Sequence, residues 1–210
     1  MNESELTKSA IAGDSGAFCD LYDLYRVRLY RYAYYRLRDR DDAEDAVSSC
    51  VLSAWEQIGK LKDPEAFPAW IFRILRGSCA GIIKTQIDRK KIIPISMTGS
   101  AESGQDGENH VGFEAEAEGF DDDGAGRAAQ AAGPSQVSSA APDPEMSAIL
   151  MEALNTLDEE SREMVLLSAV GGLTGRDIGD MYGMPQGTVR SRLSRSFAAM
   201  RKLMEAGNER

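Results

Sequence analysis

Residues 173–193 read LTGRDIGDMYGMPQGTVRSRL, and this stretch decides the fold that the sequence predicts. Thr174, followed three residues later by Asp177, has the pattern of a capping box, which predicts that a short helix begins here. The Gly-Met-Pro run at 183–185 predicts a tight turn, because glycine tolerates positive φ and proline fixes its own φ. A longer helix is expected from 186 to about 204. This order of a short helix, a turn and a longer helix predicts a helix-turn-helix.

The longer helix of this motif has two different faces. Its apolar side carries Val189, Leu193, Phe197, Met200 and Leu203. Between 186 and 202 the chain holds five basic residues and no acidic one. Such a helix suits the major groove of DNA, where polar side chains reach base edges and arginines reach phosphates. The alternative interpretation is a basic, solvated helix face at the end of a bundle.

The polar face supplies the candidate DNA contacts. The predicted contacts are Gln186, Thr188, Arg190, Ser191, Arg192, Arg195 and Lys202. Among them we expect Thr188, Ser191 and Arg192 to reach base edges. The more distal cations, together with Arg190, are expected at phosphates.

Residues 146–210 as a whole predict a small domain of four helices. Apolar residues at helical spacing predict a first helix over 146–154. Three acids at 158–160 begin a second helix, where negative charge favours the helix dipole. Two glycines at 171–172 end it.

Residues 1–93 also predict helices throughout. Apolar and aromatic residues recur at helical spacing from Phe18 to Leu37, and again over 43–61. Acids at 39–42 separate these two helices and suit the start of the second. A third long helix is expected from 67 to about 91, with Pro68 in its first turn. The sequence therefore predicts an all-α fold with a helical bundle at its N-terminal end.

The net charge of −10 is located in the middle of the chain. Residues 94–145 hold Arg127 against eleven acids, whereas 1–93 carry a net charge of +1 and 146–210 a net charge of −1. The middle segment is rich in Gly, Ser, Ala, Asp and Glu, and buries too little apolar surface to offset the entropy of ordering. It predicts a long disordered acidic linker between two small domains.

Several function classes find no support in the residues. Cys19, Cys50 and Cys79 are widely spaced, and the one histidine, His110, lies in the acidic linker, so neither a disulfide framework nor a metal site is expected. A nucleophile–base pair and a phosphate-binding glycine loop are also missing from the sequence. We expect no catalysis, no metal and no cofactor. With an acidic N-terminus and no apolar run near the ~18 residues of a membrane span, a cytoplasmic protein without membrane insertion is expected.

Two sets of motifs resemble a known family. The run LDEESREMVLL at 157–167 and the run GTVRSRLSR at 187–195 resemble region 4 of sigma-70-family transcription-initiation factors. Output domains of response regulators share a looser version of this pattern, so the second half alone leaves the class open. In the first half, DDAEDAV at 41–47, Ala-Trp at 54–55 and FPAWIFRI at 67–74 resemble region 2 of the same family. Together they resemble the extracytoplasmic-function (ECF) group.

The resemblance implies roles for residues in the first half. The acidic helix start, Asp41, Asp42, Glu44 and Asp45, would dock on the clamp helices of RNA polymerase. The loop at 59–65 would capture an unstacked base of the −10 promoter element, with cations along the opened strand. The predicted −10 contacts are Lys60, Lys62, Arg73, Arg76 and Lys84. Trp55 and Trp70 are expected to pack in the core.

The resemblance also implies partners and a mechanism. Residues 1–93 would bind core RNA polymerase and the −10 element, and 146–210 would bind the −35 element of promoter DNA. An anti-sigma protein is a further partner that such factors have. The acidic linker at 94–145 has three interpretations: a solvated tether, a mimic of nucleic acid in the polymerase channel, or a segment that folds back on the basic faces. The rival functions are a conventional helix-turn-helix regulator independent of polymerase and a protein that sequesters sigma factors.

Overall fold

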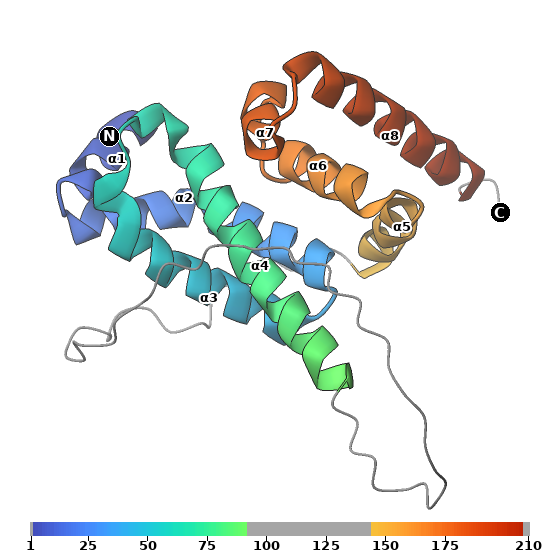
Figure 1. Cartoon of the computed structure of the whole chain (residues 1–210), viewed down its shortest axis with the longest axis horizontal. Coiled ribbons are helices and arrows are strands. Elements are labelled where there is room, and N and C mark those ends of the chain that lie inside the picture. Colours follow the sequence, from blue (N-terminus) through green and yellow to red (C-terminus); the bar gives the residue numbers. More distant parts are fainter. Residues whose placement is uncertain (1, 92–143, 208–210) are drawn as a thin grey trace, which may run out of the picture.

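The computed structural model describes residues 2–91 and 144–207, which form two helical units that lie against each other (Figure 1). The first unit consists of α1 (Glu3–Ile11), α2 (Ser15–Leu37), α3 (Arg40–Gln57), the 3-10 turns η1 (Ile58–Lys60) and η2 (Pro64–Ala66), and α4 (Phe67–Lys91). The second consists of α5 (Pro144–Asn155), α6 (Glu159–Ala169), α7 (Gly175–Tyr182) and α8 (Gln186–Gly207). Every regular element in the described ranges is helical, which confirms the all-α prediction.

The predicted acidic linker lies almost entirely outside the described residues. Its last two residues, 144 and 145, are helical, because α5 begins at Pro144. The predictions of disorder, of nucleic-acid mimicry and of folding back all concern 94–143, outside the ranges that the structure describes.

Short polar side chains begin the helices, as the sequence predicts for several of them. The Asp39 side chain accepts a hydrogen bond from the backbone N–H of Asp42 (3.0 Å) at the start of α3. The Thr174 hydroxyl accepts one from the backbone N–H of Asp177 (3.2 Å), and the Asp177 carboxylate accepts one from the backbone N–H of Thr174 (2.9 Å). This is the predicted capping box of α7. Gly183, with φ of 63°, then ends α7 in the left-handed conformation.

Aromatic rings of α2 form the core of the first unit. Tyr25 packs edge-on against Phe67 at 5.4 Å between ring centroids, and Tyr32 packs in the same way against Phe72 at 5.6 Å. All four residues are buried. These contacts join α2 to α4, and α3 packs against both helices.

The segment Pro64–Arg89, which consists of η2 and most of α4, is long and apolar enough to span a membrane by length and composition. Its composition is apolar enough although it contains Arg73 and Arg76. Arg73, Arg76 and Lys84 interrupt the segment, so it contains no apolar run of the length expected for a membrane span. In the structure this helix contributes Phe67, Ile71 and Leu75 to the buried core of the first unit.

Gly179 tests the close packing inside the helix-turn-helix. A Cβ atom at this position would come within 2.6 Å of the backbone oxygen of Met184 in the turn. We predict that Gly179→Ala displaces the turn and lowers the free energy of unfolding by about 2 kcal/mol, measured by thermal and urea denaturation with circular dichroism. The control is Gly187→Ala, where a Cβ meets nothing within 4 Å. It is expected to keep or raise stability, because alanine favours the helix. Equal stability of the two variants would contradict the close approach.

Candidate nucleic-acid and polymerase interfaces

The helix-turn-helix is held together by a small apolar contact between its two helices. Ile178 of α7 and Val189 of α8 are both fully buried, and α7, α6 and α5 all contact α8. This packing fixes the direction of α8, so that the residues on its other side face outward along one helix.

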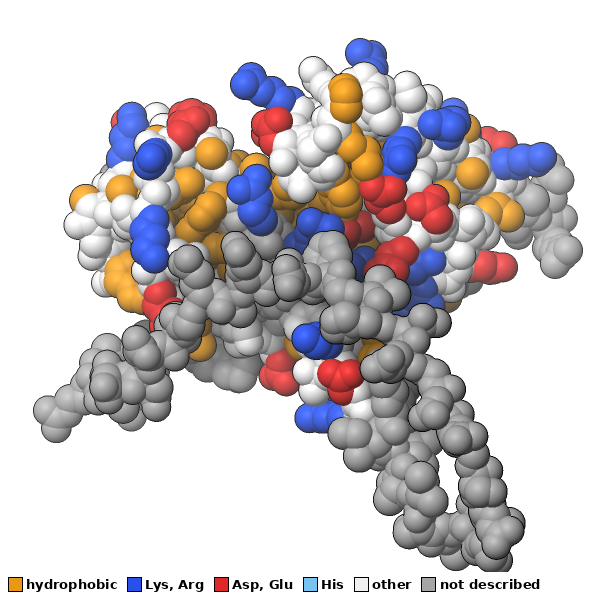
Figure 2. Space-filling view, in the orientation of Figure 1, with side chains coloured by type: hydrophobic (Ala, Val, Ile, Leu, Met, Phe, Trp, Pro, Cys, Tyr) orange, Lys and Arg blue, Asp and Glu red, His pale blue; other side chains and the backbone are white. Residues whose placement is uncertain are grey.

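The exposed side of α8 carries most of the predicted DNA contacts. The exposed members of the set are Gln186, Thr188, Arg190, Ser191, Arg195 and Lys202. Two of them are partly fixed on the helix surface. The Ser191 hydroxyl donates to the backbone oxygen of Gly187 (2.9 Å), and Nε of Arg195 donates to the backbone oxygen of Ser191 (3.3 Å). Figure 2 shows Lys and Arg side chains along the outer surface of the second unit.

Arg192 differs from the other predicted DNA contacts on α8. Its side chain is half-buried, and its guanidinium forms an ion pair with the carboxylate of Glu160 on α6. The sequence predicted Arg192 as a contact to a base edge. In the structure Glu160 holds the guanidinium at the side of α8 that faces α6.

The predicted apolar side of α8 is buried only in part. Val189 and Met200 are buried and Leu193 is half-buried, but Phe197 and Leu203 are exposed. In Figure 1 the C-terminal part of α8 extends past α5 and α6.

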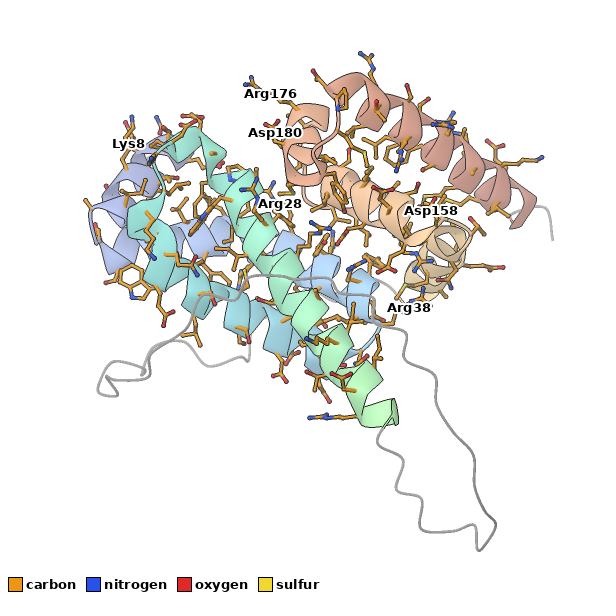
Figure 3. The ribbon with its side chains drawn as sticks, viewed as in Figure 1. Lys8, Arg28, Arg38, Asp158, Arg176 and Asp180 are labelled. Carbon is orange, nitrogen blue, oxygen red and sulfur yellow. The ribbon has the colours of Figure 1, made fainter. Side chains whose placement is uncertain are left out.

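Arg176 is a candidate DNA contact that the sequence analysis missed. It is exposed in the first turn of α7, and in Figure 3 its side chain points outward from the same end of the second unit where α8 begins. In helix-turn-helix proteins the first helix crosses the DNA backbone. The signal was present in the motif itself, as a cation at the start of the shorter helix.

The four predicted docking acids lie together at the start of α3 but are not equivalent. Asp41 and Asp45 are exposed. Asp42 is half-buried and its carboxylate accepts a hydrogen bond from the Gln86 side chain of α4. Glu44 forms an ion pair with Arg40 at 3.3 Å. The two exposed carboxylates, one helical turn apart, are therefore the ones presented outward.

Apolar residues continue the surface of α3 beyond these acids. Leu52 is 65% exposed and Trp55 is 40% exposed. Positions 45, 52 and 55 share one side of a helix, so an acidic start and an apolar end lie along one line. The expectation that Trp55 is a core residue was wrong, although its ring contacts Phe18 at 5.2 Å. Trp70 is half-buried and packs on Phe67.

The predicted −10 contacts fall into two groups. Lys60, Lys62, Arg73 and Lys84 are exposed on η1, the following loop and α4. Arg76 is half-buried and directed at the second unit, where its Nε lies 3.2 Å from a carboxylate oxygen of Glu163. Its guanidinium also lies over the ring of Tyr182, at 4.6 Å from the centroid. The structure thus separates Arg76 from the other four cations.

The described cysteines have different surroundings. Cys19 is exposed, whereas Cys50 and Cys79 are buried in the first unit. Burial raises the pKa of Cys50 to about 12 and that of Cys79 to about 12. Because the thiolate is the reactive form, these two thiols are inert near neutral pH. Within residues 2–91 and 144–207, no three His, Cys, Asp or Glu side chains gather in a way that suits a metal ion.

Two family models match the chain at the two units. Residues 21–86 match Sigma-70 region 2, and residues 147–200 match Sigma-70, region 4. The first match contains α3 and its acids as well as most of α4. The second contains the helix-turn-helix. Together they cover more than half of the chain.

Relatives of known identity resemble the chain over most of its length. ECF RNA polymerase sigma factor SigW of Bacillus subtilis is 24% identical, and the match covers 93% of this chain and 92% of SigW. ECF RNA polymerase sigma factor SigM of Mycobacterium tuberculosis is 26% identical, with coverage of 97% and 85%. ECF RNA polymerase sigma factor BldN of Streptomyces coelicolor is 26% identical, and the match covers 95% of this chain but 65% of BldN.

Solved structures show the same fold. CnrH, solved in complex with the cytosolic domain of CnrY, gives a TM-score of 0.60 at 19% identity, and 97% of each chain is covered. The sigma factor RpoE from Bartonella quintana, solved with the anti-sigma factor NepR, gives a TM-score of 0.54 at 20% identity, covering 87% of this chain and 94% of RpoE. With both family regions present in order, the chain belongs to the sigma-70 family and is an ECF sigma factor.

Proposed function

We propose that this sigma factor binds core RNA polymerase through its first unit and directs promoter-specific initiation by recognising the −10 and −35 elements. The first unit docks on polymerase and holds the opened −10 strand. The second unit places α8 in the major groove of the −35 element. RNA synthesis itself belongs to the polymerase, and the factor contributes no catalysis.

The observation that carries this proposal is the exposed polar face of α8. Between 186 and 202 it presents five basic residues and no acid, and it lies inside the region 4 match. We assign Thr188 and Arg192 to base edges, since arginine pairs with guanine in the major groove. On DNA the Arg192 guanidinium would exchange its ion pair with Glu160 for the base. Arg190, Arg195 and Lys202 are assigned to phosphates, with Arg176 of α7 beside them. Gln186 and Ser191 complete the polar surface.

The first unit has two surfaces with opposite charge. Asp41 and Asp45, followed by Leu52 and Trp55, form a stripe on α3 that we propose as the polymerase-docking surface. The exposed cations Lys60, Lys62, Arg73 and Lys84 form the proposed path of the single strand, because cations along a strand bind its phosphates. The loop at 59–65 is the proposed pocket for an unstacked base.

Each of the three parts of the chain has a separate proposed role, and a further protein partner is proposed. We assign 1–93 to polymerase and −10 binding, 94–145 to the linker, and 146–210 to −35 binding. The solved structures of CnrH and RpoE contain the cytosolic domain of CnrY and the anti-sigma factor NepR. By analogy we propose that an anti-sigma protein binds this chain. Action on promoter DNA places it in the cytoplasm.

Run-off transcription tests the proposed function directly. Purified core polymerase is supplied with a library of promoter fragments, with and without this protein. Promoter-specific transcripts that require the protein are expected, and they also give the recognition sequence. DNA binding without any binding to polymerase would instead support a conventional helix-turn-helix regulator. The region 2 match at 21–86 does not favour that alternative.

Arg192 distinguishes base recognition from phosphate binding. We predict that Arg192→Ala reduces discrimination between promoter and random DNA by about 1–3 kcal/mol, measured by competitive binding of the holoenzyme at fixed salt. Arg195→Ala is the matched control, and it is expected to weaken both DNAs about equally. An equal loss on both DNAs for Arg192→Ala would make it a phosphate contact.

Asp45 tests the polymerase-docking surface. We predict that Asp45→Lys weakens binding to core polymerase about tenfold, because a reversed charge opposes a complementary surface. The measurement is a titration of labelled factor with core polymerase. Asp20→Lys, an exposed charge reversal on α2, is the control and should bind as the wild type does. Unchanged affinity for Asp45→Lys would remove α3 from the interface.

A further inference from the structure

Arg192 lies at the edge between the buried side and the outward side of α8. Val189, three residues before it, and Ser196, four residues after it, are both buried. Thr188 and Arg195, on the side proposed for DNA, are exposed. Residues three or four apart are neighbours on a helix surface, so Arg192 has a neighbour of each kind above and below it. Its long side chain can therefore reach toward the body of the second unit or toward DNA.

In the structure the Arg192 guanidinium is directed at the start of α6, which packs against α8. Its Nη1 donates to Oε2 of the Glu160 carboxylate. The two side chains are 32% and 39% exposed, so the ion pair is neither buried nor fully solvated. Asp158, labelled at the start of α6 in Figure 3, is a second acid nearby. Its pKa is lowered, first by the backbone hydrogen bond from Ser161 and to a smaller degree by the positive charge of Arg192.

DNA offers Arg192 two kinds of contact that compete differently with this ion pair. A phosphate accepts a hydrogen bond as the Glu160 carboxylate does, but at a surface where water and salt screen the attraction. Partial burial makes the pair with Glu160 the stronger of these two, although such a pair changes an equilibrium by only about fivefold or less. A guanine presents O6 and N7 together, and arginine bound to both discriminates against other bases by about fivefold to a hundredfold. Arg192 is therefore expected to leave Glu160 for guanine but not for a phosphate.

We propose that Glu160 is an internal competitor for Arg192, which keeps this arginine off the phosphates of random DNA and releases it to a guanine of the promoter. On random DNA the ion pair persists, so α8 binds with one cation fewer. On a −35 element with guanine at this position, the guanidinium exchanges the carboxylate for the base. Glu160 is thus a positioning residue that acts through Arg192. The inference rests on the proposed function for its target, whereas the competition with phosphate needs no promoter.

A double-mutant cycle tests this competition. Wild type, Glu160→Gln, Arg192→Ala and the double variant are bound, as holoenzyme, to a promoter fragment and to random DNA of the same length at fixed salt. The glutamine keeps the length of the side chain and removes its charge. In the wild-type background we expect Arg192→Ala to weaken promoter binding about tenfold and random binding by less than about twofold. In the Glu160→Gln background it should weaken random binding as well, by about threefold.

Salt dependence supplies a readout that a merely structural role of Glu160 would not move. Each added phosphate contact makes the slope of log K against log salt concentration steeper by about 0.9. We expect this change on random DNA for Glu160→Gln, and we expect none for Glu160→Gln when Arg192→Ala is also present. Glu152→Gln removes the same charge from an exposed site on α5 and should keep the wild-type slope. Circular dichroism checks that each variant is folded.

The outcomes separate this competition from the proposed function. A loss on random DNA from Arg192→Ala that is equal in both backgrounds overturns the competition, as does a folded Glu160→Gln that behaves like Glu152→Gln. The measurements on random DNA are repeated with the free factor, so they require neither polymerase nor promoter. The expected coupling on random DNA without promoter-specific transcripts supports the competition and contradicts the proposed function. Transcripts without any coupling between the two positions support the proposed function and overturn the competition.

Discussion

One buried carboxylate, that of Glu163, lies at the centre of the polar contact between the two helical units. Glu163 is enclosed by two arginines and two tyrosine hydroxyls, and its burial requires all of them at once. Burial of the two tyrosines and, after it, the charge of Glu163 raise the pKa of Tyr182 and of Tyr32, so both hydroxyls remain protonated donors near neutral pH. The donors come from α2, α4 and α7, so this group joins α6 to two helices of the first unit and to α7.

The helix that makes this contact possible is α2. Six of the seven tyrosines in the chain lie on it. A tyrosine buries its ring and carries a hydroxyl at the tip, so one residue serves both an apolar core and a polar contact. Tyr32 packs its ring on Phe72 while its hydroxyl reaches Glu163. Tyr25 does the same with Phe67 and the carboxylate of Glu3. The core of the first unit and the contact with the second are therefore built by the same helix.

The sequence predicted the features whose partners are close along the chain. The capping box of Thr174 and Asp177 spans three residues, and the glycine that ends α7 acts through its own φ. The contact of Glu163 with Tyr32 spans 131 residues. In the run LDEESREMVLL nothing local distinguishes a buried acid from its exposed neighbours, so Glu163 was missed. For the same reason Arg76 and Arg192 were grouped with exposed cations, although each is paired with an acid of α6.

The charge distribution connects these observations with function. A chain with a net charge of −10 suits DNA only because its excess of negative charge lies at 94–145, while both ends are nearly balanced. Individual surfaces can then carry opposite charge: carboxylates face outward on α3, and cations face outward on α8.

Chemical footprinting of a promoter tests most directly whether the factor and polymerase together engage both promoter elements. With core polymerase and factor together, we expect protection at both −35 and −10 and permanganate-reactive thymines near −10. Protection of a single site by the factor alone, without reactive thymines when polymerase is added, would contradict it.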